Sequence, residues 1–307
     1  MQPLWIDTDM GVDDALAIGL ASKCPEVEIV GVAVVAGNVA QEVGVRNALQ
    51  VLELLGRDEV PVYVGADAPL ARSAVDAHAV HGSEGLGQAR LPEPSMLPAG
   101  GAVDGLVDEI RARPGELVVV AVGPLTNLAL AERASPGVLN CARRVVAMGG
   151  ALWRAGNVTP HSEFNVYADP HALVELLQAE VNLTLIPLDI TEKLALMKDQ
   201  IAARLRGRSD SWGPFVADAT HTVIQYEQEQ SDFSGLHLHD PAAVAMVIDP
   251  SLFDFRTVSI DVETKGDQIG HTVVCSGDER RAYPVECAVE VDVVRCTEFL
   301  SHRLLDI

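Results

Sequence analysis

An apolar run followed by a cluster of acids decides the fold: Leu4-Trp5-Ile6-Asp7-Thr8-Asp9-Met10-Gly11-Val12-Asp13-Asp14. A short apolar run without polar alternation is typical of a strand that is buried on both faces of a parallel sheet. Residues 13–22 then indicate a helix whose first turn is acidic, where the helix dipole favours anions. Because ligands of open α/β sheets bind at the carboxyl ends of the strands, we expect a polar site directly after this first strand.

The same alternation of apolar runs and helical patterns continues through the first two thirds of the chain. Further buried strands are expected at residues 29–35, 60–64, 117–122, 144–147 and 183–188, and helices at residues 40–55, 102–113, 125–133 and 170–178. Such alternation predicts an α/β fold with an open, mainly parallel, Rossmann-like sheet that is flanked by helices and joined by right-handed crossovers.

The last third of the chain is less regular. Extra C-terminal helices are expected at residues 191–206, 212–228, 241–248 and 294–305, whereas residues 258–262, 272–275 and 285–291 alternate and predict short antiparallel edge strands. Neither a repeat nor a long linker divides the sequence. We therefore expect a single domain over residues 1–307.

The composition argues against several classes of protein. The 307 residues include 22 Lys and Arg against 44 Asp and Glu, so the net charge is −22 at pH 7. Nucleic-acid polymers and anionic membranes would be repelled. No apolar run reaches the roughly 18 residues that span a bilayer, and the first residues do not resemble a signal peptide. The five cysteines contain no CxxC pair, so we expect a cytoplasmic protein with reduced thiols.

The acidic cluster itself predicts a metal site. Asp7, Asp9, Asp13 and Asp14 are four carboxylates within eight residues, and they repel one another unless a cation or several backbone donors compensate them. Helix capping explains one or two of these acids but not four beside a buried strand. Oxygen ligands suit the hard cations Ca²⁺ and Mg²⁺, although the spacing is not that of an EF-hand loop.

The run from Asp7 to Ile18 resembles the N-terminal fingerprint of the nucleoside hydrolases, the inosine–uridine-preferring N-ribohydrolase family. Segments similar to this family recur in order: Ala36-Gly37-Asn38, Val80-His81-Gly82, Gly123-Pro124-Leu125-Thr126-Asn127, Met148-Gly149-Gly150, Gly156-Asn157, Glu163-Phe164-Asn165-Val166 and His239-Asp240-Pro241. The resemblance implies a calcium-dependent enzyme that hydrolyses the N-glycosidic bond of ribonucleosides to ribose and free base. It also implies a homo-oligomer, a dimer or a tetramer.

The resemblance further implies roles for individual residues. The Ca²⁺ ligands would be Asp9, Asp14, Asp240 and the backbone carbonyl of Thr126, and Asp9 would also activate a calcium-bound water. The ribose hydroxyls would be bound by Asp13, Asn38, Asn157, Glu163 and Asn165, between walls formed by Met148 and Phe164. His239 would assist departure of the base, and His81 would be a second histidine of the active site.

The pocket for the nucleobase is less well determined by the sequence. Tyr226, Trp212, Gln225 and Gln228 of the late helix are candidates, as is Trp153 from the segment after Met148. Aromatic faces would stack on the base. The phase of the helix is ambiguous, so the choice among these residues stays open, as does the choice between purine and pyrimidine substrates.

Two other functions remain as alternatives. The first is a Mg²⁺-dependent phosphohydrolase of the haloacid-dehalogenase type with Asp7 as nucleophile, although Gly11 stands where that family has Thr or Val. The second is a non-catalytic protein that binds ribose or nucleosides. Asp9 and His239 favour catalysis over binding, because binding alone needs neither a base nor an acid.

Overall fold

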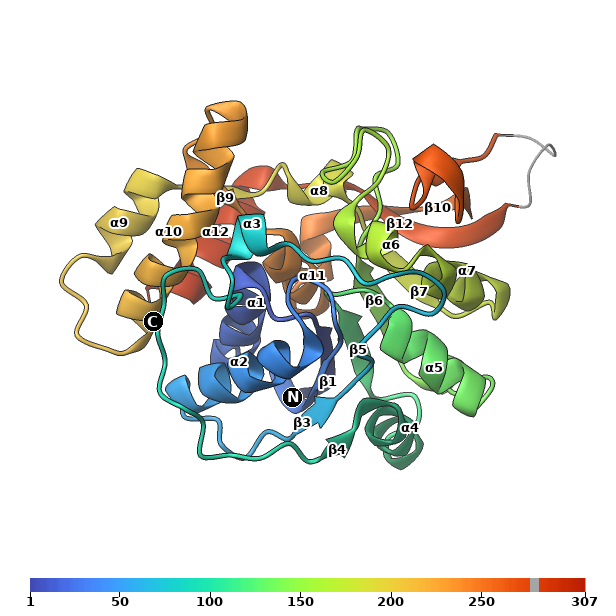
Figure 1. Cartoon of the computed structure of the whole chain (residues 1–307), viewed down its shortest axis with the longest axis horizontal. Helices are drawn as coiled ribbons and strands as arrows, with labels where there is room; N and C mark the ends of the chain where they lie inside the picture. Colours follow the sequence, from blue (N-terminus) through green and yellow to red (C-terminus); the bar gives the residue numbers. More distant parts are fainter. Residues whose placement is uncertain (277–281, 307) are drawn as a thin grey trace.

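One long sheet passes through the middle of the computed structural model, which describes residues 1–276 and 282–306. In this part of the chain the sheet has ten strands in the order β11-β10-β12-β7-β6-β5-β1-β2-β3-β4 (Figure 1). Their bounds are β1 (Gln2–Thr8), β2 (Val27–Val34), β3 (Val62–Val64), β4 (Gly100–Gly101), β5 (Val118–Ala121), β6 (Arg144–Met148), β7 (Leu183–Ile186), β10 (Phe253–Val262), β11 (Thr272–Val274) and β12 (Tyr283–Val291).

The sheet is mainly parallel, as the sequence predicts. β1 pairs in parallel with both β2 and β5, with Leu4 opposite Ile29 and Ile6 opposite Val120. β10 is antiparallel to both β11 and β12. The sequence predicts an antiparallel strand at residues 285–291. This is confirmed for the pairing of β12 with β10, whereas the pairing of β12 with β7 is parallel.

Helices cover both faces of the sheet. Alternate residues of β1 enter opposite layers: Leu4 and Ile6 join one apolar cluster, and Trp5 joins the other. Both faces of the strand are therefore buried, which explains its uninterrupted apolar run. The first layer holds α1 (Val12–Lys23), α2 (Gln41–Leu54), α10 (Trp212–Ser231), α11 (His239–Ile248) and α12 (Val293–Leu305), and the second holds α4 (Ala102–Ala112), α5 (Thr126–Ala134) and α7 (Pro170–Gln178).

The expected helix at residues 191–206 is confirmed only over residues 198–205. The segment forms the end of α8 (Leu188–Thr191), the strand β8 (Ala195–Met197) and α9 (Lys198–Leu205). β8 pairs with β9 (Gly235–His237) in a separate two-stranded sheet. Pairing with a strand some forty residues away overrides the local helical pattern, and it fixes the chain that leads into α11.

The chain reverses its direction of travel across the sheet at β1. It proceeds from β1 through β2 and β3 on one side, then returns through β5, β6 and β7 on the other. The carboxyl end of β1 therefore lies at the switch point where open α/β sheets bind ligands. Two short helices lie near this edge, α3 (His78–His81) and α6 (Phe164–Ala168). Of the helices described, none is both long and apolar enough to cross a membrane.

Candidate active site

A pocket of about 690 Å³ opens at this carboxyl edge of the sheet. Its lining includes residues at or shortly after the ends of four adjacent strands: Asp13, Asn38, Val122 and Met148. These strands are β1, β2, β5 and β6, which flank the switch point. The polar residues that follow the expected strands in the sequence thus converge in one cavity.

The turn between β1 and α1 is strained in a way that shapes this cavity. Met10 has a φ of 50°, in the left-handed region that non-glycine residues seldom adopt. Such a residue costs roughly 1–3 kcal/mol and persists only where its surroundings enforce it. Here the Thr8 hydroxyl accepts the Met10 N–H at 3.1 Å and donates to the Asp14 carboxylate. The turn places consecutive acids at the start of α1.

Asp14 is held by four hydrogen-bond donors. Its Oδ1 accepts from the Thr8 hydroxyl and the Asp9 N–H, and its Oδ2 accepts from the Gly11 N–H at 2.7 Å and Asn38 Nδ2 at 3.0 Å. Donors on both oxygens favour the ionised form. Burial acts against that form and raises the pKa of Asp14.

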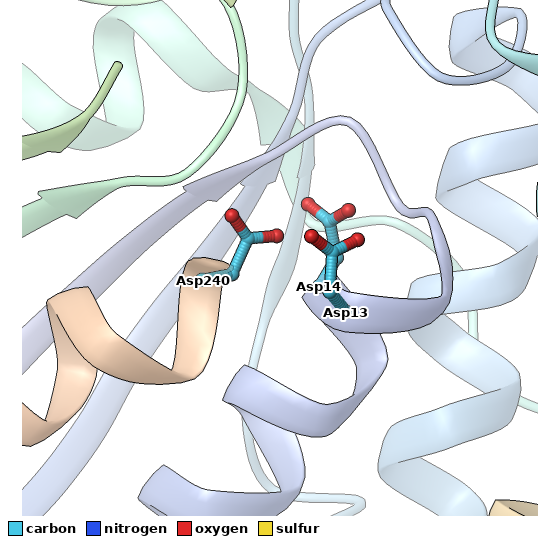
Figure 2. A group of neighbouring side chains, drawn as sticks. All are labelled: Asp13, Asp14 and Asp240. Carbon is cyan, nitrogen blue, oxygen red and sulfur yellow. The ribbon is translucent and has the colours of Figure 1, made fainter. Parts of the chain in front are cut away.

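Three carboxylates meet at the floor of the pocket. Figure 2 shows Asp13 and Asp14 facing Asp240, which comes from the first turn of α11. One ligand atom from each of them lies within 4.8 Å of the other two. The group contains oxygen donors only, the set that a hard cation such as Ca²⁺ or Mg²⁺ prefers. It contains Asp13, whereas the resemblance implied Asp9 beside Asp14 and Asp240.

Burial and mutual repulsion make this group costly to ionise. Desolvation raises the pKa of Asp240 well above its usual value, and the charges of Asp13, Asp14, Asp9 and Glu163 raise it further. Desolvation also raises the pKa of Asp13 to about 6. A bound cation would offset both effects, since it favours the charged form of every ligand. The residues present therefore fit a divalent metal ion.

Asp9 lies beneath the pocket surface, next to Asp14. Its Oδ2 accepts the N–H of Asn38 at 2.8 Å, and its Oδ1 accepts Asn38 Nδ2 at 3.0 Å. Backbone packs closely around the carboxylate: a Cβ on Gly37 would lie 2.1 Å from Asp9 Oδ2, and one on Gly123 would lie 3.1 Å from Asp9 Cγ. Glycine at both positions leaves the room that this buried acid needs.

The structure does not bring Thr126 to the pocket lining. Thr126 begins α5, and its hydroxyl donates to Asp169 Oδ2 at 2.8 Å. Val122, just past the end of β5, lines the pocket instead, and its carbonyl accepts Asn165 Nδ2 at 2.8 Å. Both residues belong to the same turn between β5 and α5. The geometry therefore favours Val122 over Thr126 as a source of a carbonyl ligand.

The residues expected around the ribose all line the pocket: Asp13, Asn38, Met148, Asn157, Glu163, Phe164 and Asn165. Glu163 accepts N–H groups of Asn165 at 2.8 Å, Gly150 at 3.0 Å and Val166 at 3.1 Å, and it caps α6. These bonds fix the side chain before any ligand arrives. Asp13 differs, because its Oδ1 is buried and has no hydrogen-bond partner among the described residues.

Two of the three histidines that line the pocket, His81 and His239, are held in their neutral form. His81 Nδ1 accepts the Val12 N–H at 3.1 Å, so the neutral ring carries its proton on Nε2. Burial lowers the pKa of His81 to about 4. His239 Nδ1 lies 2.8 Å from the Thr191 hydroxyl, and burial together with His237 lowers the pKa of His239 to about 3.

Three of the four residues of α10 that the sequence offers for the nucleobase pocket do not line it. Tyr226 lines the pocket, as the sequence allows. Trp212 is buried in the core and its indole N–H donates to the Leu304 carbonyl, so it is no base-stacking residue. Gln225 donates to Glu229, and Gln228 to Ser234, away from the pocket lining. Sequence reasoning missed the lining residues Glu192, Val223, Glu227, Gln230, Ser231 and His237.

Two further residues lie outside the pocket lining. Trp153 is 57% exposed on the surface. Asp7 is fully buried in β1, where its Oδ2 accepts Asn127 Nδ2 at 3.0 Å. A nucleophile must reach the substrate, and Asp7 neither lines the cavity nor contacts a lining residue through this bond, whereas Asp9 is hydrogen-bonded to the lining residue Asn38. This position counts against a phosphohydrolase that uses Asp7.

Comparisons with known proteins identify the family of the chain. The family model described as inosine-uridine preferring nucleoside hydrolase matches residues 4–298. The chain is 37% identical to the pyrimidine-specific ribonucleoside hydrolase RihA of Citrobacter koseri, over 98% of this chain and 97% of that protein. It is 33% identical to uridine nucleosidase 1 of Arabidopsis thaliana, over 99% and 93% of the two chains.

A solved structure extends the likeness to the fold. The purine-preferring ribonucleoside hydrolase from Gardnerella vaginalis superposes with a TM-score of 0.92 at 33% identity, and the match covers 99% of this chain and 98% of that one. The sequence and the fold therefore point to the same family. The chain belongs to the inosine-uridine preferring nucleoside hydrolase family and is an enzyme of that class.

Proposed function

We propose that this enzyme hydrolyses ribonucleosides to ribose and free base with Ca²⁺ as its metal and Asp9 as the base that activates water. The observation that carries the proposal is the oxygen-only group of Asp13, Asp14 and Asp240, which lies at a pocket whose lining also includes Asn38, Asn157, Glu163 and Asn165. When bound, Ca²⁺ would supply Lewis acidity and positions for water and sugar hydroxyls.

The ligands that we propose are Asp14 and Asp240, which the observed group and the family resemblance share, together with Asp9 from the resemblance and the carbonyl of Val122, which replaces Thr126 for the reason given above. Asp13 is then left for the sugar. Its unpartnered Oδ1 needs a donor, and a ribose hydroxyl supplies one. The contact of Asp9 with Asn38, which lines the pocket, supports a place for Asp9 directly behind the reacting atoms.

The charge of the pocket suits the chemistry. Cleavage of a glycosidic bond passes through a transition state with positive charge on the sugar. Asp13, Glu163 and Asn165 surround the proposed sugar position with oxygen atoms that stabilise this charge. Glu163 and Asn165 are already fixed by hydrogen bonds, so they need little reorganisation during the reaction.

Removal of the metal is expected to abolish activity. The test incubates the protein with inosine, uridine and p-nitrophenyl phosphate, before and after exhaustive chelation, and measures ribose, free base and phosphate. We expect ribose and base from at least one nucleoside, loss of at least about 10²-fold on chelation and recovery on added Ca²⁺. Release of phosphate would support the phosphohydrolase instead. Undiminished activity after chelation would rule out the metal.

His239→Ala is expected to lower kcat most for the substrates with the poorest leaving groups. His239 Nδ1 lies 2.8 Å from the Thr191 hydroxyl, and in the tautomer in which this hydroxyl donates to Nδ1, the Nε2–H of His239 is free to donate a hydrogen bond to the departing base. Such assistance is typically worth 10²–10⁴ in rate. The loss in kcat should therefore be large on inosine and small on p-nitrophenyl riboside, whose leaving group needs no proton. Equal losses on both substrates would remove this role and make His81 the next candidate.

Three further predictions complete the proposal. The pairing of β12 with β7 joins the C-terminal part to the main sheet and supports one domain over the whole chain. The described cysteines are all free thiols, which supports a cytoplasmic location. Assembly into a homo-oligomer stays a prediction from the family resemblance.

A further inference from the structure

One end of the pocket is formed by a single face of α10. Val223, Tyr226, Glu227 and Gln230 line it, and their spacing of three and four residues places them side by side along the helix. α10 packs against α3 and β9, which carry the lining histidines His81 and His237 (Figure 1). The carboxylates at the floor belong to α1 and α11 instead. A nucleoside whose ribose lies over that floor would extend its base toward α10.

Glu227 differs from the other acids near this end, because none of the described residues neutralises its charge. Its side chain is half-buried, and neither a hydrogen bond nor an ion pair joins its carboxylate to another described residue. Glu192 also lines the pocket but forms an ion pair with Arg154. Asp76 lies 3.1 Å from His78 Nδ1. Of the described residues that line the pocket, none is Lys or Arg.

An ionised carboxylate in such a place selects for hydrogen-bond donors. It accepts hydrogen bonds and donates none. An exocyclic amino group offers it two N–H donors, whereas a keto oxygen at the same ring position offers only lone pairs that the carboxylate repels. Gln230 and Ser231 do not discriminate in this way, because an amide and a hydroxyl both donate and accept. Glu227, unlike Gln230 and Ser231, can therefore tell the two kinds of base apart at the ring position that carries the amino or the keto group.

We propose that Glu227 is a specificity-determining residue that accepts a hydrogen bond from the exocyclic amino group of the nucleobase. Cytidine and adenosine are then better substrates than uridine and inosine, their keto counterparts. The inference rests on the proposed function and names the substrate class of the same site. A site that hydrogen-bonds a polar group of its substrate discriminates strongly against an analogue that lacks this group. An apolar pocket discriminates much less between substrates that differ only in size.

The test compares kcat/KM on two matched pairs, cytidine with uridine and adenosine with inosine. For the wild-type enzyme we expect the amino member to exceed the keto member about tenfold or more in the pair that is hydrolysed faster. Glu227→Gln should lower that ratio about tenfold, because a carboxamide donates to a keto oxygen as well as it accepts from an amino group. Glu227→Ala, which removes the carboxylate without a substitute, should lower the ratio too.

Glu229→Gln is the matched control. Glu229 lies on the same helix, is exposed, and accepts from Gln225 outside the pocket lining. This variant should keep the wild-type ratio. A wild-type enzyme that treats both members equally or favours the keto member in that pair would overturn the inference, as would an unchanged ratio in Glu227→Gln and Glu227→Ala. Absence of ribose from all four nucleosides would overturn the proposed function as well, so the two failures are distinguishable.

Discussion

Asp240→Asn is expected to remove the metal and to lower kcat/KM on a ribonucleoside on the order of 10³-fold, while the metal-free protein becomes more stable. The side chain keeps its shape but loses the charge that Asp13, Asp14, Asp9 and Glu163 oppose. Relief of that repulsion should raise the melting temperature of the metal-free protein by about 2 °C or more. Calorimetry and metal analysis measure the two effects. The exposed Asp254→Asn is the control and should change neither.

The same repulsion gives the metal-free protein a characteristic dependence on pH. The folded pKa of Asp13 is about 6, above its usual 3.8, and that of Asp240 is raised as well. Between the unfolded and folded values the native state binds more protons than the unfolded chain, so stability falls as pH rises. We expect Asp13 to make the free energy of unfolding decrease from about pH 4 to pH 6, and added Ca²⁺ to remove this contribution. His81 and His239 contribute with the opposite sign in this window, because their folded pKa values are lowered to about 4 and about 3. The contribution of Asp13 is therefore the difference between the wild-type protein and Asp13→Ala, and an equal pH dependence of the two, or an Asp240→Asn variant that still binds metal, would contradict the site.

Uridine is expected to exceed 2′-deoxyuridine in kcat/KM by about 10²–10⁴-fold. The 2′-hydroxyl is the donor that we assign to Asp13, whose buried Oδ1 otherwise lacks a partner among the described residues. A hydrogen bond to a charged group is worth about 1.5–3 kcal/mol, and leaving the buried carboxylate unpaired adds a further penalty. Steady-state kinetics on both nucleosides measure the ratio.

Asp13→Ala separates recognition of the hydroxyl from general loss of activity. The variant should slow uridine far more than 2′-deoxyuridine, because the deoxy substrate already lacks the contact that the substitution removes. 5′-Deoxyuridine keeps both ring hydroxyls and should behave like uridine. Comparable values for uridine and 2′-deoxyuridine in the wild-type enzyme would show that Asp13 does not read this hydroxyl.

Local patterns in the sequence determined most of the fold. The apolar run before Asp7, the acidic turn after it and the alternation of strands and helices predict the parallel sheet that the structure contains. Local sequence is enough to predict these strands, because a strand that is buried on both faces is apolar at every position and does not alternate with polar residues. The ordered family segments likewise predicted residues that line one pocket, from Asn38 to Asp240.

Tertiary structure alone decided which of several nearby residues reach the pocket. After β5, Val122 lines the cavity and Thr126 does not. Which of the two residues reaches the cavity depends on how the segment between β5 and α5 packs, and the local sequence does not determine this. The face that α10 presents, with Glu227 inward and Gln225 outward, depends on its contacts with α3 and β9. β8 forms a strand because β9 lies beside it, although the local pattern is helical. Asp13 meets Asp240 only because β1 and α11 are brought together in space, across more than 220 residues of sequence.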